Sequence, residues 1–69
     1  MRWEDQVGAN IRRLRKSMGL SQEALAQKAG MSMRFLAGLD RGEENPSLTY
    51  LVKLAYALEV SPADLFKQD

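Results

Sequence analysis

The sequence predicts an all-α domain of five short helices spanning residues 1–69. Apolar residues recur every three or four positions, which is the spacing of one helix face, and no stretch shows the alternation of a half-buried strand. A hydrophobic fraction of 45% is ordinary for a globular chain, and 69 residues suffice for one small domain. Four serines precede helical patterns, where a hydroxyl caps a helix start: Ser21, Ser32, Ser47 and Ser61.

A first helix is expected from about Glu4 to Met18, and Gly19 ends it as a C-terminal glycine should. One apolar stripe runs along this helix through Val7, Ile11, Leu14 and Met18. The basic residues of the segment lie mostly off that stripe and are expected to face solvent: Arg12, Arg13 and Lys16.

The second and third helices form a predicted helix-turn-helix over about residues 21–41. The second begins after Ser21 and runs through Leu25, Ala26 and Ala29 to Gly30. The third begins after Ser32, carries Leu36 and Leu39, and has Arg41 in its last turn before Gly42. Because only two residues separate the two helices, Gly30 and Met31, they must cross at a steep angle.

A fourth and a fifth helix complete the predicted fold. Ser47 caps the fourth, whose apolar positions are Leu48, Leu51, Leu54, Ala55 and Leu58. Ser61 caps the fifth, with Pro62 at its first position and Asp64 completing a capping box. We expect Leu65 and Phe66 to dock this last helix against the rest of the domain.

The composition excludes several kinds of function. The chain has no Cys and no His, which excludes disulfides, thiolate metal sites, catalytic triads and a histidine general base. No enzyme activity, metal or cofactor is therefore expected. No small-molecule ligand is expected either, because a single domain of this size leaves no room for a ligand-sensing module. No apolar run approaches the ~20 residues of a membrane span, and the start Met1–Asp5 is polar, unlike a signal peptide. The predicted location is the cytoplasm.

Charge is distributed unevenly along the chain. Residues 1–42 carry eight Lys/Arg and four Asp/Glu, a net charge of +4, whereas residues 43–69 carry two and five, a net charge of −3. A basic half of this kind either faces an anion such as DNA or is simply a solvated surface.

The segment LSQEALAQKAGMS at residues 20–32 resembles the lambda-repressor-like, Cro/XRE-type helix-turn-helix family. The likeness extends from about Ile11 to Phe66 and includes Leu36, Leu39–Gly42, Asn45–Leu48, Leu54–Leu58 and Val60–Leu65. Its physical basis is clear at particular positions. Ala26 is small where the two helices nearly touch, Gly30 supplies the turn, and the plug between the helices is formed by Leu25, Ala29, Leu36 and Leu39.

The resemblance implies a DNA-binding transcriptional regulator, either a repressor or a controller, that binds a palindromic operator in double-stranded DNA. The length and layout are similar to restriction-modification controllers and antitoxins of the family. The alternative is a protein-interaction or coactivator module with the same fold.

In the family the third helix enters the major groove. This implies base contacts from Met33, Arg34, Phe35, Ala37 and Gly38, and phosphate contacts from Gln22, Ser32 and Asn45. Arg34 is the only one of the five base-contact candidates with side-chain donors, and a guanidinium matches the O6 and N7 of guanine. Its alternatives are a phosphate contact or a pair with Glu23. Phe35 is alternatively packed at the helix edge, and Glu43 and Glu44 stand where a basic loop would hold the backbone better.

Two further expectations concern an internal ion pair and the oligomeric state. Arg15 and Asp40 border apolar stripes, and the matching family positions usually hold a paired Arg and Glu, so we predict an at least partly buried ion pair. The alternative is two independent surface charges.

Since one helix reads few base pairs, a homodimer is predicted. Its interface is expected on the fourth and fifth helices at Tyr50, Tyr56, Val60, Leu65 and Phe66; Leu58 is the candidate expected to be core, and Trp3 covers either the core or the partner.

Overall fold

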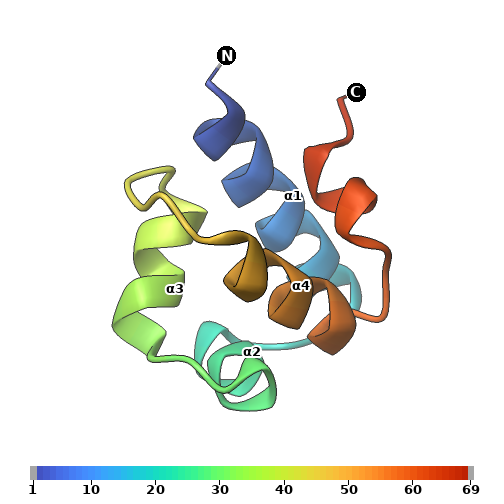
Figure 1. Ribbon diagram of the computed structural model, residues 1–69. Coiled ribbons are helices and arrows are strands. Elements are labelled where there is room, and N and C mark those ends of the chain that lie inside the picture. Colours follow the sequence, from blue (N-terminus) through green and yellow to red (C-terminus); the bar gives the residue numbers. More distant parts are fainter. Residues whose placement is uncertain (1, 69) are drawn as a thin grey trace.

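The computed structural model describes residues 2–68 and shows four α-helices followed by one short 3₁₀ helix (Figure 1). They are α1 (Trp3–Ser17), α2 (Gln22–Ala29), α3 (Met33–Asp40), α4 (Leu48–Ala57) and the 3₁₀ helix η1 (Pro62–Phe66). The α-helices begin and end within about one residue of the predicted positions, except that Arg41 follows α3 as its C-cap instead of lying in its last turn. None of the helices between residues 2 and 68 is long and apolar enough to cross a membrane.

The prediction of five α-helices was wrong at the fifth. Pro62–Phe66 is a 3₁₀ helix, because five residues starting from a proline are too few for a stable α-helical ladder. The predicted capping box is present: the Ser61 hydroxyl accepts from the N–H of Ala63 at 3.2 Å, and the Ser61 N–H donates to the Asp64 carboxylate at 3.0 Å. The cap therefore forms although the helix that follows is of the tighter type.

Local signals set the helix ends. The hydroxyls of Ser21, Ser32 and Ser47 each accept from the N–H three residues later, at 3.0, 3.1 and 3.3 Å. At the other end, α1, α2 and α3 are each followed by a glycine with φ near +70°, namely Gly19, Gly30 and Gly42. At the end of α4 a non-glycine residue, Glu59, takes the corresponding left-handed position with φ of 60°.

The helices surround one core. α1 packs against α3 and η1, α4 packs against η1 and α2, and α2 packs against α3. Figure 1 shows α4 in front of the end of α1, with α3 on the left, η1 on the right and α2 below. Every predicted apolar position of α4 is buried except Leu48, which is 71% exposed. Leu48 is the first residue of α4 and lies outside the buried face of the helix.

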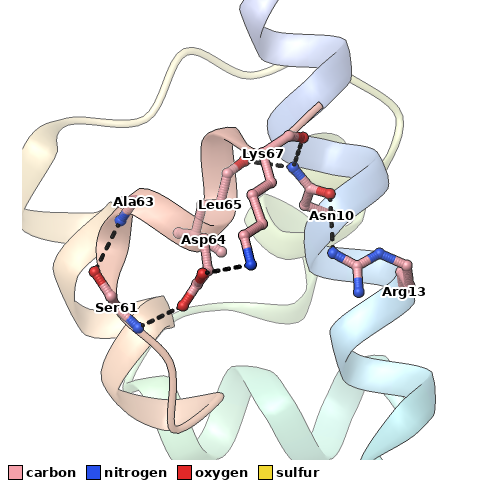
Figure 2. Close-up of polar contacts among 7 residues, drawn as sticks. All are labelled: Asn10, Arg13, Ser61, Ala63, Asp64, Leu65 and Lys67. Atoms are coloured by element: carbon pink, nitrogen blue, oxygen red, sulfur yellow. Dashed lines mark hydrogen bonds and ion pairs between the residues drawn. The ribbon is translucent and has the colours of Figure 1, made fainter. Parts of the chain in front are cut away.

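Two small or polar residues of α1 let the other elements approach closely. A Cβ on Gly8 would collide with the Leu39 carbonyl oxygen and lie 3.0 Å from that of Asp40, so α1 and α3 cross there. Asn10 is buried, and its amide donates to the carbonyls of Leu65 and Lys67 at 2.9 and 2.8 Å (Figure 2). These contacts hold η1 on α1.

Candidate nucleic-acid interface

The relative orientation of α2 and α3 is fixed by a short turn and by apolar packing. Gly30 has φ of 70°, and Ser32 caps α3 immediately afterwards. The side chains of α2 and α3 that form the predicted plug are all buried: Leu25, Ala26, Ala29, Leu36 and Leu39. The predicted plug is therefore present, and it holds α3 on the surface with its first turn exposed.

The outward face of α3 carries a free cation. Leu36, Leu39 and Asp40 face the core, so Arg34 projects on the opposite side. Arg34 is exposed and makes no hydrogen bond or ion pair with any residue from 2 to 68, so the alternative pair with Glu23 does not form. Met33 is half exposed, and Ala37 is partly buried next to Arg34.

Two predicted base contacts are in packing positions instead. Phe35 is half-buried against the core, and its ring centroid lies 5.0 Å from that of Tyr50 on α4. Gly38 is buried, because a Cβ built on it would lie 2.5 Å from Cγ of Glu44. The loop side chain of Glu44 therefore covers Gly38, one of the base-contact candidates.

The three predicted phosphate contacts lie at or near helix starts. Gln22 is the first residue of α2, and its side-chain amide donates to Asp40 Oδ2 at 2.8 Å. The Ser32 hydroxyl is exposed, but it already accepts from the N–H of Phe35. Asn45 is exposed in the loop before α4 and has no side-chain hydrogen bond to the described part of the chain. The first N–H groups of α2 and α4 also lack helical acceptors.

Arg15 and Asp40 lie together in the interior. Arg15 Nη2 is 3.3 Å from Asp40 Oδ2, and the two side chains are 11% and 5% exposed. Arg15 Nη1 also donates to the Leu20 carbonyl at 3.0 Å. Yet Arg15 Nε and Asp40 Oδ1 are buried without partners among residues 2–68. The pair therefore meets through a single contact.

The sequence did not predict that several side-chain donors from other elements meet at the end of α3. The Gln22 amide joins the Asp40 carboxylate, and Arg12 donates to the Asp40 carbonyl at 2.7 Å. Arg2 donates to the Gly42 carbonyl at 2.6 Å, and its hydrogen bond to Asp5 raises the pKa of the guanidinium. Cations at a helix C-terminus satisfy free carbonyls, but Arg12 and Arg2 are 28 and 40 residues away from the carbonyls they contact, so no local signal in α3 identifies them. Arg12 is exposed, as its place off the apolar stripe predicted, and its guanidinium also ties α1 to the end of α3.

The predicted dimer contacts do not lie on one surface. Leu65 and Leu58 are core residues, which corrects the prediction for Leu65, and the Tyr50 ring packs at a tilt against Phe35 of the third helix. Phe66 is partly exposed, with its ring centroid 6.1 Å from that of Trp3. Tyr56 is 86% exposed, and a partly buried Val60 lines a shallow hollow beside it.

An exposed apolar stripe on α4 was missed. Leu48, Val52 and Tyr56 follow one another at intervals of four, so they share one helix face, and all three are exposed. A second shallow hollow, between the end of α2 and this stripe, is lined by Val52, Lys53 and Tyr56. The spacing of the three residues is visible in the sequence, but it overlaps the spacing of the buried set.

Known proteins share both the sequence and the fold. The family model described as Helix-turn-helix matches residues 11–65. The uncharacterized HTH-type transcriptional regulator y4dJ of Sinorhizobium fredii is 44% identical over 59 residues, which cover 86% of this chain and 77% of that protein. The transcriptional regulator SinR of Bacillus subtilis is 38% identical over 56 residues, and the chain spans only 50% of its length.

Solved structures agree with these matches. The restriction-modification controller protein C.AhdI from Aeromonas hydrophila has a TM-score of 0.89 and 41% identity, with 91% of this chain and 96% of that chain covered. SinR in complex with DNA has a TM-score of 0.84 and 35% identity, covering 88% of this chain and 98% of that chain. Since the family match extends from α1 to η1, the chain belongs to the helix-turn-helix family of transcriptional regulators.

Proposed function

We propose that this protein is a cytoplasmic transcriptional regulator that binds a two-fold symmetric DNA operator as a homodimer. The observation that carries the proposal is the unpaired Arg34 on the outward face of α3, the second helix of a rigid helix-turn-helix. A cation in the first turn of a helix opposes the helix dipole, so it contributes little to folding. A contact between the Arg34 guanidinium and DNA would explain a cation at this position.

In this proposal α3 lies in the major groove and reads base edges. Arg34 donates to O6 and N7 of a guanine, while Met33 and Ala37 make apolar contacts such as those with a thymine methyl group. Phosphates on either side are held by Gln22, Ser32 and Asn45. The Gln22 amide has a second N–H beyond the one given to Asp40, and this N–H is free to donate to a phosphate oxygen.

Dimerisation is supported by the exposed stripe of α4. Its residues Leu48, Val52 and Tyr56 form an apolar strip that no element between residues 2 and 68 covers. Two copies related by a two-fold axis bury this strip against each other, and Tyr56 enters a hollow of the partner. The two α3 helices then read half-sites ~34 Å apart on one face of the DNA.

Selection of bound duplexes from a random DNA pool, followed by fluorescence anisotropy on the recovered site, tests DNA binding. The expected result is a palindromic site with a guanine in each half. Sedimentation equilibrium with and without that duplex tests the dimer. A chain that binds no duplex even in low salt contradicts the proposal and favours the alternative, a protein-interaction module that uses the apolar stripe of α4.

A further inference from the structure

Gly38 leaves a gap on the outward face of α3, and Glu44 fills it. Gly38 lies four residues after Arg34, so the two positions share one face of the helix. A Cβ on Gly38 would lie 2.5 Å from Cγ of Glu44 and 3.3 Å from its carboxylate oxygen Oε1. The side chain of Glu44 therefore occupies the place that a side chain at position 38 would take.

The loop that carries Glu44 is anchored on both sides. The N–H of Glu43 donates to the Gly38 carbonyl at 2.9 Å, and Pro46, two residues after Glu44, is buried. The neighbouring Glu43 is paired with Arg41 at 3.0 Å, whereas Glu44 forms no hydrogen bond or ion pair with residues 2–68. A partly buried carboxylate is thus held beside the Arg34 face without a partner of its own.

This arrangement is unfavourable for simple contact with the DNA backbone, because a carboxylate repels phosphate. In the major groove, however, the base pairs present donors as well as acceptors. Those donors are the exocyclic amino groups of cytosine N4 and adenine N6, and a glutamate accepts from such a group. A carboxylate set one helical turn from Arg34 is suited to the base pair beside the one that Arg34 reads.

We propose that Glu44 is a specificity-determining residue, which accepts a hydrogen bond from the exocyclic amino group of one base in each half-site. Gly38 allows this by leaving room for the glutamate on the reading face. The inference rests on the proposed DNA-binding function and extends it from α3 to the loop that follows. The base is cytosine or adenine, and the selected site distinguishes the two.

The test compares Glu44→Ala with Glu43→Ala, which removes the same charge from the adjacent, exposed residue. Each variant is taken through selection from a random duplex pool and through anisotropy on operators changed at single base pairs. Wild-type protein should prefer one amino-bearing base by roughly fivefold or more at one position per half-site. Glu44→Ala should lose that preference and keep the others. Glu43→Ala should keep them all.

Gly38→Ala is an independent variant, because its methyl group displaces the Glu44 side chain. It should lose the same base preference as Glu44→Ala, with circular dichroism showing that it is folded. If both glutamate variants tighten binding equally on every duplex with unchanged base preference, Glu44 only repels phosphates and the inference is overturned. A wild-type chain that binds no duplex overturns the proposed function itself.

Discussion

Asp40, the last residue of α3, accepts hydrogen bonds from side chains of both α1 and α2. Its Oδ2 accepts from Arg15 of α1 and Gln22 of α2, and its carbonyl accepts from Arg12. A buried carboxylate is stable only while such donors surround it. Because Gln22 begins α2 and Asp40 ends α3, the same group fixes both ends of the helix-turn-helix.

Removal of Arg15 should therefore be costly. Arg15→Ala leaves the Asp40 carboxylate with the Gln22 amide as its remaining side-chain donor, and we expect a loss of about 3 kcal/mol in the free energy of unfolding. Urea denaturation followed by circular dichroism measures it. The control is Lys16→Ala, an exposed neighbour, which should change stability by less than about 0.5 kcal/mol. Equal stability of the two variants would contradict the role given to this ion pair.

Lengthening the acid should strengthen the same pair. Arg15 Nε and Asp40 Oδ1 are buried without partners, and Asp40→Glu adds the methylene needed for a two-point contact. We expect the free energy of unfolding to rise by about 1 kcal/mol, which shifts the midpoint of urea denaturation to a higher concentration. A lower midpoint would indicate that the space around Asp40 cannot accept the extra methylene.

Arg34 provides the functional prediction at this scale. If its guanidinium reads guanine, Arg34→Ala should weaken operator binding by about 1–3 kcal/mol and random-sequence binding very little. Anisotropy titrations on both duplexes over a range of salt concentrations measure this. Equal losses on the two duplexes, with a salt slope reduced by about one, would show a phosphate contact instead.

At the scale of an element, the end of α4 differs from those of the other α-helices. Glu59 has φ of 60° where α1, α2 and α3 are followed by glycine. Its N–H still donates to the Tyr56 carbonyl, and the N–H of Val60 donates to that of Ala55. The helix therefore ends by the same hydrogen-bond pattern at the cost of a strained backbone angle.

This strain can be measured with two variants at one position. Glu59→Gly and Glu59→Ala both lose the exposed contact with Lys28, but only glycine relieves the left-handed conformation. Glu59→Gly should be more stable than Glu59→Ala by about 1 kcal/mol. Thermal denaturation of the two variants compares them directly. A glycine variant that is no more stable would mean that the chain adopts another turn there.

At the scale of the whole molecule, the apolar stripe of α4 is the surface proposed for the dimer. Tyr56 is 86% exposed, so Tyr56→Asp should leave the fold intact while placing a charge in the proposed dimer contact. Sedimentation equilibrium should then show monomers, and operator affinity should fall because one half-site binds alone. Tyr56→Phe, which keeps the ring, should remain dimeric. A dimer that survives Tyr56→Asp would exclude this surface.

The sequence by itself determined the features that depend on near neighbours along the chain. Serine caps, the glycine that follows each of the first three helices, and the capping box involve groups two to five residues apart. Such contacts form wherever the local backbone allows them, so residue type and spacing predict them. The resemblance to the helix-turn-helix family predicted the plug between α2 and α3 and the outward position of Arg34.

Only the tertiary structure decided which apolar residues are covered and which polar groups meet. Leu48 and Leu65 both fit an apolar pattern, yet one is 71% exposed and the other is core, because burial depends on which elements pack around each residue. Gln22 meets Asp40 across 18 residues, and Glu44 fills the space above Gly38. These contacts depend on how the helices cross and where the loop lies, and periodicity along one helix carries no information about either.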